Sequence, residues 1–522
     1  MTPSIYSLFV LGAFLTCVFT PVVRHLALKR GFVDCPQRAR KVHQHPIPRL
    51  GGAAVLGSYL VILLIGGLTV PSLQATLWGE NPVAGVIVLG ALVIFGIGVL
   101  DDLSRLSPRV KLLGEFLTVG AVVWFADLSF STVEVIGIGS ISFPNWFGFG
   151  LACLWIAGMA NAVNLIDGLD GLASGITLLG LIAISVVGFL LPIPDVTWLS
   201  TLLIGCLLGF LVYNSRPASI FLGDCGSLTL GYLAGCLCLL ASASPAENGV
   251  VAEGKINGIF PLLAFALPIT DCIFAIVRRI LRGRSPFSPD MEHFHHRLMA
   301  KGLSHGKAVL AMWAAAFTCS FVSVAAALGK GDQLTALFVF FGFGGFILLR
   351  YLGYFRFEFF GQGFSSLLEN RKSARTAEQA VKNAEELLSQ MNSIEEIPEA
   401  FGKAAEGMQF QEVSLVFFEE GHGRLGIKGE ANTSTTRKSI NWKDPKQSGF
   451  YSRDKEFVTD FGINGRNFAY GSIRYTYMDG RIGLDVQEEI LLERIHDALA
   501  SMAARVSKNI EGITSVEEIT SD

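Results

Sequence analysis

The amino-acid sequence predicts an all-α polytopic membrane protein that carries a soluble α+β domain at its C-terminal end. The chain of 522 residues is 51% hydrophobic and only 16% charged, which is too apolar for an ordinary soluble protein. Apolar runs of bilayer-spanning length recur up to about Tyr354 and then stop. We therefore expect a membrane domain over residues 1–355, a linker over 356–375, a soluble α+β domain over 376–512 and a tail over 513–522.

The membrane domain is expected to contain eleven helical spans, taken as apolar runs of roughly 17–25 residues. They lie near residues 5–23, 51–70, 83–100, 111–128, 148–163, 174–192, 197–213, 226–243, 257–277, 308–328 and 334–354. The stretch 128–150 could contain an interfacial element around Pro144, Asn145 and Trp146, and ten spans is the alternative count.

The distribution of Lys and Arg predicts the orientation of these spans. Net charge is −3, which gives no sign of a nucleic-acid partner, yet basic residues gather in the loops 24–49 and 278–307. Because loops rich in Lys and Arg stay on the cytoplasmic side, both loops are expected to be cytoplasmic and the N-terminus outside. Residues 5–23 are followed rather than preceded by positive charge, so they are expected to remain as the first span.

Under this topology every polar motif falls on the cytoplasmic side. Asp101 and Asp102 end an apolar run, where paired carboxylates favour proton acceptance or a nearby cation. The alternative is a solvated helix end.

A second motif contains Asn164, Asp167 and Asp170, interleaved with two glycines. If the segment is helical, the two Asp residues share a face and could hold phosphate or a metal ion. The alternative is a turn, which Asn, Asp and Gly favour.

A third motif runs from Asn214 through Phe221 to Asp224, which Gly residues flank. A hard oxygen ligand beside an arginine and an aromatic ring suits a nucleotide diphosphate with Mg²⁺. The alternative is a turn that opens the next span.

Two further motifs are basic. His293, His295, His296 and Arg297 follow the ninth span and favour contact with phosphate over a zinc site, because no carboxylate or Cys lies at zinc spacing. The first basic loop offers Lys41, His43 and Arg49, which could attract an anionic headgroup or serve only as topology charges.

Together these motifs resemble those of the polyprenyl-phosphate N-acetylhexosamine-1-phosphate transferases, a membrane family that also includes the peptidoglycan lipid I synthase. The resemblance covers roughly residues 1–355 and rests on Pro48-Arg49-Leu50-Gly51-Gly52, the Asp pair, the Asn164–Ala173 run, Phe221-Leu222-Gly223-Asp224 and the His loop, in family order. The lipid I synthase branch has a different sequence at Pro48–Gly52, which points to UDP-GlcNAc as donor, with UDP-GalNAc or a deoxy-aminosugar as alternatives.

The resemblance implies that a polyprenyl phosphate, such as undecaprenyl phosphate, attacks a UDP-N-acetylhexosamine at the cytoplasmic face of a bacterial inner membrane and releases UMP. Asp224 and Asp167 would bind Mg²⁺, for which Mn²⁺ could substitute, and Asp101 and Asp102 would act at the acceptor phosphate. The substrates would be bound by Asn164, Asp167, Asp170, Asn214, Phe221, His293, His295, His296, Arg297, Lys41, His43 and Arg49. A homodimer is a further expectation.

The soluble part has a charged helical stretch over 373–391, strand-like runs at 412–418 and 468–477, and an amphipathic helix near 486–506. This order resembles a GAF-type sensor domain, and a structural cap is the alternative. The rival function for the whole chain is a transporter or flippase of nucleotide-linked or lipid-linked sugars. Transporters place ionisable groups near the bilayer midplane, whereas these Asp residues lie at span ends.

Overall fold

The chain forms two compact units in the structure, which is a computed structural model. The membrane unit comprises Met1–Val277 with Glu292–Arg356, and the C-terminal unit comprises Arg278–Met291 with Phe357–Asp522. The structure describes residues 3–34, 47–79, 83–104, 106–130, 132–135, 139–243, 260–281, 285–286, 292–328, 364–391, 393, 396–408, 410, 412–418, 436–443, 457–464, 469–477, 488, 491–502 and 505.

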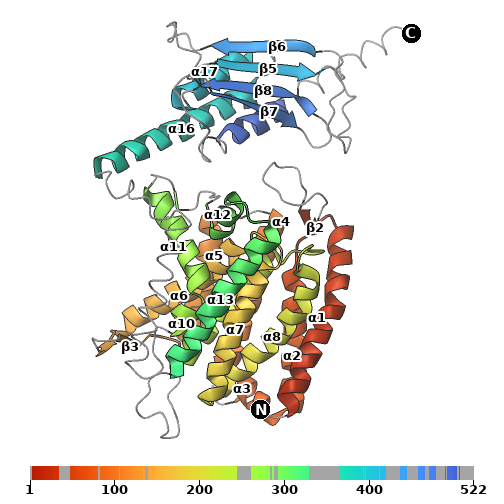
Figure 1. Ribbon diagram of the computed structural model, residues 1–522, viewed down its shortest axis with the longest axis vertical. Coiled ribbons are helices and arrows are strands. Elements are labelled where there is room, and N and C mark those ends of the chain that lie inside the picture. Colours follow the sequence, from red (N-terminus) through yellow and green to blue (C-terminus); the bar gives the residue numbers. More distant parts are fainter. Residues whose placement is uncertain are drawn as a thin grey trace. The chain divides into compact units, whose positions relative to one another are not determined.

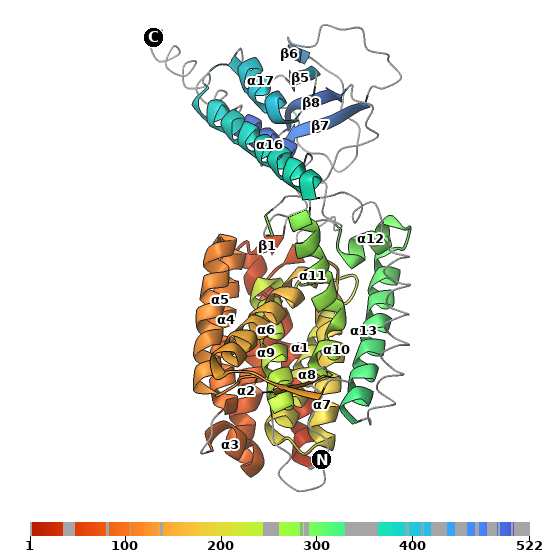
Figure 2. The ribbon, with the colours of Figure 1, turned by 90° about the vertical axis from the view of Figure 1, so that its left-hand side faces the viewer.

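The membrane unit is a bundle whose long helices run side by side (Figures 1 and 2). Eight described helices are long and apolar enough to cross a membrane, namely α1, α2, α4, α6, α7, α8, α9 and α13, so the fold is that of a multi-pass membrane protein. The helices are α1 (Pro3–Lys29), α2 (Gly51–Thr69), α3 (Pro71–Trp78), α4 (Val83–Ser104), α5 (Pro108–Phe125), α6 (Asn145–Ile166), α7 (Leu172–Leu190), α8 (Pro194–Asn214), α9 (Gly223–Ala243), α10 (Phe260–Ala264), α11 (Ala266–Leu281), α12 (Phe294–Ala300) and α13 (His305–Leu328).

Three of the eleven expected spans are not among these eight. The span expected at 111–128 is the helix α5, which carries the charges of Arg109, Lys111 and Glu115. The span expected at 257–277 appears as the short helix α10 followed by α11, with Phe265 between them. The span expected at 334–354 lies outside the described residues.

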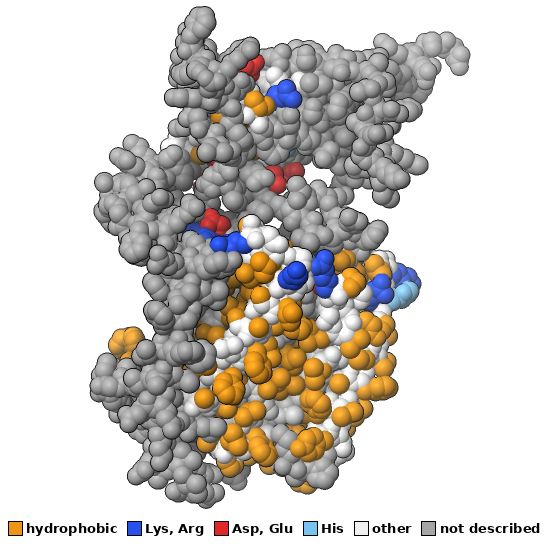
Figure 3. Space-filling view, viewed as in Figure 1, with side chains coloured by type: hydrophobic (Ala, Val, Ile, Leu, Met, Phe, Trp, Pro, Cys, Tyr) orange, Lys and Arg blue, Asp and Glu red, His pale blue; other side chains and the backbone are white. Residues whose placement is uncertain are grey.

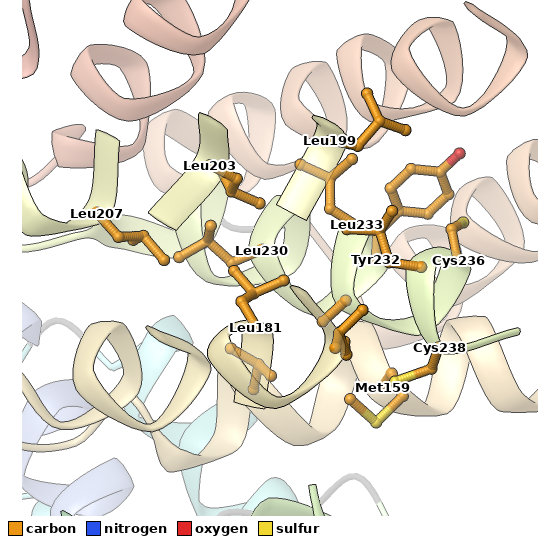
Figure 4. Packing of buried hydrophobic residues seen from close by; sticks show 14 of the residues in the cluster. Met159, Leu181, Leu199, Leu203, Leu207, Leu230, Tyr232, Leu233, Cys236 and Cys238 are labelled. Atoms are coloured by element: carbon orange, nitrogen blue, oxygen red, sulfur yellow. The ribbon is translucent and has the colours of Figure 1, made fainter. Parts of the chain in front are cut away.

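Helix α9 forms the centre of the bundle, since all its residues from Cys225 to Ala241 are buried. Leu230 and Leu233 of α9 meet Leu203 of α8, Leu181 of α7 and Met159 of α6 in one apolar cluster (Figure 4). The first turn of α9 is therefore held in place from several sides, and that turn contains Asp224.

The outer surface of the membrane unit suits a lipid environment. Apolar side chains cover its flank, and Lys and Arg side chains gather near one end (Figure 3). Two short antiparallel pairs connect helices, β1 (Val33–Asp34) with β2 (Ile47–Pro48) and β3 (Thr132–Val135) with β4 (Gly139–Ser142). The second pair occupies the stretch in which an interfacial element was expected.

The C-terminal unit contains a four-stranded antiparallel sheet in the order β6-β5-β8-β7. Its strands are β5 (Glu412–Phe418), β6 (Thr436–Lys443), β7 (Phe457–Asn464) and β8 (Ala469–Tyr477), and its helices are α16 (Phe364–Gln390), α17 (Ile397–Met408) and a helix over residues 491–502. Val413, Leu415, Ile473 and Tyr475 alternate along β5 and β8 and form a core with these helices.

Helix α17 and strands β6 and β7 are not among the elements expected from the sequence. Residues 356–375 were expected to form a linker, whereas α16 begins at Phe364. The charged pattern of α16 continues through the expected boundary, so composition alone gave no sign of where the helix begins. The likeness to a GAF-type domain stays a prediction.

Candidate active site

A lysine joins two of the predicted carboxylates. Lys111 Nζ lies 2.7 Å from Asp101 Oδ2 and 2.8 Å from Asp224 Oδ2. The side chains of Lys111 and Asp101 are almost buried, with 12% and 13% exposed, while 39% of the Asp224 side chain is exposed. Charged hydrogen bonds of this length are strong when shielded from water. The end of α4, the first turns of α5 and the start of α9 are thus held together by one ammonium group.

Asp102 has a different role from Asp101. Its Oδ1 accepts a hydrogen bond from the backbone N–H of Asp224 at 3.1 Å, and its Oδ2 accepts one from Cys225 at 3.0 Å. A carboxylate in this position stabilises a helix N-terminus, because it satisfies free N–H groups and faces the positive end of the helix dipole. Gly223 has a φ of 76°, and a Cβ there would lie 2.9 Å from Asp102 Oδ2. Only glycine allows the carboxylate this close.

We expected Asp101 and Asp102 to act at the acceptor phosphate, on a different loop from Asp224, and that role stays a prediction. Both are tied to the Asp224 segment, Asp101 through Lys111 and Asp102 directly, because α4 packs along α9 and brings its end to the start of α9. Asp102 uses both of its oxygens on backbone N–H groups, so the structure assigns it to holding the loop.

Helix α6 contributes the polar side of the site. Asn164 Nδ2 donates to Asp224 Oδ1 at 3.1 Å and to Ser227 Oγ at 2.9 Å. One turn earlier, Asn161 Nδ2 donates to Glu115 and to the carbonyl oxygen of Ala157. Asn164 therefore lies beside Asp224 and fixes the second oxygen of that carboxylate, while its predicted contact with substrate stays a prediction.

The segment with Asp167 and Asp170 is a turn, not a continuing helix. Helix α6 ends at Ile166 and α7 begins at Leu172, with Gly171 at a φ of 72°. The two carboxylates therefore do not share a helical face. Asp170 Oδ2 accepts from the backbone N–H of Ala218 at 3.1 Å, and the Asp170 backbone N–H donates to His305 Nε2 at 3.1 Å.

Asp167 lies near enough to the other charged residues of the site for their charges to affect its pKa. Burial raises its pKa to about 8, with the charges of Asp224 and Asp102 acting in the same direction and Arg49 in the opposite one. Burial is the largest cause, and the nearby carboxylates add to it. A cation bound beside Asp167 would favour its ionised form.

The segments 48–52 and 221–222 are joined through their backbones. Phe221 N–H donates to the carbonyl oxygen of Pro48 at 2.9 Å, Gly51 N–H to that of Phe221 at 2.9 Å, and Gly52 N–H to that of Leu222 at 2.8 Å. Arg49 and Phe221 are thereby held at the rim of the Asp224 loop. Lys41 and His43 lie outside the described residues.

Asn214 was expected to contact substrate, and the structure contradicts this expectation. The residue is only 2% exposed. It accepts from Ser174 Oγ at 2.8 Å and donates to the Ile220 carbonyl oxygen at 3.0 Å. The buried Asn214 amide therefore stabilises the segment that leads to Asp224 through these two hydrogen bonds.

The histidine loop forms α12 and the residue before it. His293 bonds Asp271, and Arg297 bonds Glu292 at 2.6 Å. His295 is 2% exposed, and the centroid of its ring lies 4.2 Å from that of the His296 ring. Burial lowers the pKa of His295 to about 2, with His296 and His293 acting in the same direction. The expected contact of these imidazoles with phosphate stays a prediction, and the buried His295 is neutral at physiological pH.

Lys111, Glu115 and Asp271 are not among the site residues expected from the sequence. All three are ionisable residues inside expected spans, a placement that usually marks a functional site. That signal was present in the sequence. Lys111 lies at the start of an expected span, where basic residues are common. Its partners Asp101 and Asp224 lie on other helices, so the pairing depends on how α4, α5 and α9 pack.

The donor set fits a hard divalent cation better than zinc. Among the described residues there is no group of three His, Cys, Asp or Glu side chains placed to hold a metal ion. Mg²⁺ is commonly held by one or two carboxylates together with water and substrate phosphates, and it does not need a cage of protein ligands. The partly exposed carboxylate of Asp224, with Asp167 nearby, offers such a set.

The profile of glycosyl transferase family 4 matches residues 84–242, which include Asp101, Lys111, Asp167 and Asp224. The chain is 37% identical over 317 residues to a probable undecaprenyl-phosphate N-acetylglucosaminyl 1-phosphate transferase of Bacillus subtilis, covering 60% of this chain and 83% of that protein. The chain belongs to glycosyl transferase family 4.

Two further relatives extend the comparison. The decaprenyl-phosphate N-acetylglucosaminephosphotransferase of Mycolicibacterium smegmatis is 35% identical over 318 residues, 58% of this chain and 77% of that protein. The undecaprenyl-phosphate alpha-N-acetylglucosaminyl 1-phosphate transferase of Thermotoga maritima is 32% identical over 290 residues, 54% of this chain and 78% of that protein. The family resemblance stated from the motifs is confirmed.

Proposed function

We propose that this protein transfers GlcNAc-1-phosphate from UDP-GlcNAc to undecaprenyl phosphate, forming a polyprenyl-diphospho-sugar that starts synthesis of a cell-envelope polysaccharide. The observation that carries the proposal is the cluster in which Lys111 joins Asp101 and Asp224 at one end of the helical bundle. The names of the relatives support the reaction class and the acceptor. They favour a transferase over a transporter.

The chemistry follows from phosphoryl transfer. An oxygen of the acceptor phosphate attacks the β-phosphorus of the UDP-sugar, the bond between the β-phosphorus and the bridging oxygen breaks, and UMP leaves. Such reactions need in-line positioning and neutralisation of the phosphate oxygens. Lys111 and Arg49 supply positive charge from the protein. A phosphate monoester is already mostly dianionic, because its second pKa is near 6, so Asp101 has little need to act as a base.

Mg²⁺ is the cofactor that fits this donor set, with Mn²⁺ as a substitute. Asp224 and Asp167 would hold it, and it would neutralise the diphosphate of the donor. Asn164 fixes the other oxygen of Asp224. Asp102 keeps the backbone of the same loop in place.

The site is proposed to face the cytoplasm at the bacterial inner membrane. Helix α1 ends with Lys29, and the chain returns through β2 to the segment that bonds Phe221 and Leu222. The basic end of α1 and the Asp224 loop are thus on the same end of the bundle. Because positive charge marks the cytoplasmic side, the N-terminus lies outside and the C-terminal unit in the cytoplasm.

The proposal is tested with purified protein, undecaprenyl phosphate and a panel of UDP-N-acetylhexosamines. We expect UMP release with UDP-GlcNAc, its loss with EDTA and its return with Mg²⁺. The matched control is UDP-glucose, which lacks the acetamido group. If no donor in the panel yields UMP with any polyprenyl phosphate, the assignment is wrong.

A further inference from the structure

Asp271 is a buried carboxylate that the proposed reaction does not use. It lies in α11 and is 1% exposed. A carboxylate in apolar surroundings is costly unless its oxygens accept hydrogen bonds. Its Oδ2 lies 2.9 Å from His293 Nδ1, and its Oδ1 accepts from the backbone N–H of Phe294 at 3.0 Å. Both oxygens are thus directed at the first residues of the histidine loop.

The contact fixes the protonation pattern of the His293 ring. A carboxylate accepts hydrogen bonds, so the proton of the ring lies on Nδ1, and Nε2 points away from Asp271. The ring is stacked on that of His295, with centroids 5.8 Å apart and an interplanar angle of 3°. The orientation of one imidazole therefore constrains the other.

His295 in turn lies against the turn that carries Asp167. A Cβ on Gly168 would be 2.5 Å from His295 Nε2, so the ring occupies the space where a side chain would be. The ring itself is buried, while Gly168 stays exposed on its other side. Asp271, His293, His295 and Gly168 thus form a continuous path from α11 to the candidate site.

We infer that Asp271 is a positioning residue for the donor side of the site. It holds His293 in one tautomer and fixes the start of α12, so that the His295 ring stacked on His293 lies against the Asp167–Asp170 turn. This inference rests on the proposed function, because it takes that turn as the place where the donor diphosphate binds.

The variant Asp271→Asn separates positioning from simple packing. The amide oxygen still accepts from Phe294, but the amide nitrogen donates to His293 Nδ1 and moves the ring proton to Nε2. We expect the KM for UDP-GlcNAc to rise about 10–100-fold, as for the loss of a partner that orients a functional histidine, with the KM for undecaprenyl phosphate unchanged. Asp195→Asn is the matched control, since Asp195 lies in the first turn of α8, away from these residues.

A double variant tests whether Asp271 acts through His293. In a His293→Gln background, Asp271→Asn should cause little further change, because the two substitutions interrupt the same path. Effects that simply multiply would overturn the inference. So would a folded Asp271→Asn protein with the wild-type KM for the donor.

Hydrogen exchange of residues 294–300 provides a measurement that does not depend on activity. Asp271→Leu removes both acceptors and should accelerate exchange over α12 at least tenfold, whereas Asp271→Asn should leave it close to wild type. Unchanged exchange in Asp271→Leu would contradict the positioning role. If wild-type protein releases no UMP, the proposed function fails, and the exchange experiment still decides whether Asp271 holds α12.

Discussion

The two units of this protein bury polar groups in different ways. In the membrane unit, Lys111 joins two carboxylates from different helices, one of them partly exposed. In the C-terminal unit, His496 Nε2 lies 3.0 Å from the hydroxyl of Tyr475, and both residues are buried. The first arrangement keeps charge next to a surface that a ligand can reach. The second satisfies a pair inside a core, which indicates a structural role.

The C-terminal unit also contains a partly exposed ion pair. Arg494 bonds Glu385 through two nitrogens, at 2.8 Å and 2.5 Å, and links the helix over 491–502 to α16. Both partners belong to the C-terminal unit, and the pair ties two of its helices together. The family match covers residues 84–242, so we expect the catalytic chemistry in the membrane unit and not in the C-terminal unit.

The largest effect is expected for Asp224→Asn. The substitution removes the charge that pairs with Lys111 and that would hold the cation. Loss of one well-placed electrostatic contact costs about 10²–10³ in rate, so kcat should fall at least this far and the Mg²⁺ dependence should weaken. Steady-state rates over a Mg²⁺ series measure both, with Asp195→Asn as control. Near-normal turnover with an unchanged Mg²⁺ optimum would exclude Asp224 as the ligand and favour Asp167.

Asp101→Asn and Asp102→Asn should differ from each other. Asp101 faces Lys111, so its loss should lower kcat and raise the KM for undecaprenyl phosphate. Asp102 accepts hydrogen bonds from the N-terminus of α9, so its loss should cost about 1 kcal/mol of stability, as for other helix caps. It should reduce activity only because the backbone around Asp224 is held less firmly. Thermal unfolding and acceptor kinetics on both variants distinguish the roles. Identical kinetic and thermal effects would mean that the pair acts as one group.

The sequence was sufficient to predict which segments meet at the site. Asp101, Asn164, Asp224 and the Pro48–Gly52 segment were predicted as one site, and the structure brings them together. Residue type and position at helix ends carry that information, because an ionisable group at the edge of a membrane span is costly and is usually kept for a function.

The detailed roles could not be predicted from the sequence. Nothing in the Asp-Asp pair distinguishes the residue that bonds Lys111 from the one that caps α9, because that depends on how α4 packs on α9. In the same way, the burial of Asn214 and His295 follows from tertiary packing. In the C-terminal unit, β6 and β7 have mixed polar patterns that became strands through pairing with β5 and β8.

Removal of the C-terminal unit should have a smaller effect. A chain that ends at Gly363 keeps every residue of the candidate site. Its kcat with UDP-GlcNAc should stay within roughly threefold of the full chain, a change of less than about 1 kcal/mol in the barrier. Size-exclusion chromatography in detergent confirms that the shortened protein is folded. Complete loss of turnover in a stable shortened protein would show that the C-terminal unit takes part in catalysis.

A further prediction concerns the stability of the C-terminal unit as a function of pH, which does not affect the reaction at neutral pH. Burial lowers the pKa of His496 to about 4. Between about pH 6.5, the ordinary pKa of His, and pH 4, the unfolded chain binds a proton that the folded unit excludes. Stability should therefore fall as the pH is lowered through this range, by up to about 1.4 kcal/mol per pH unit. Hydrogen exchange of residues 491–502 in the full chain measures it.

The variant His496→Gln serves as the control for this titration. It cannot take up the proton, so the part of the pH dependence that His496 causes should disappear, while UMP release stays at the wild-type level. An unchanged slope would assign the pH dependence to other groups. A large loss of activity would contradict the division between the two units.

The most direct test of the account is the identity of both products when reconstituted protein receives UDP-GlcNAc, undecaprenyl phosphate and Mg²⁺. Attack on the β-phosphorus predicts UMP and undecaprenyl-diphospho-GlcNAc in equal amounts by mass spectrometry, and neither product from Asp224→Asn. Release of UDP with undecaprenyl-phospho-GlcNAc would mean that the bond to the sugar breaks instead, which would contradict the proposed reaction at the Lys111 and Asp224 cluster.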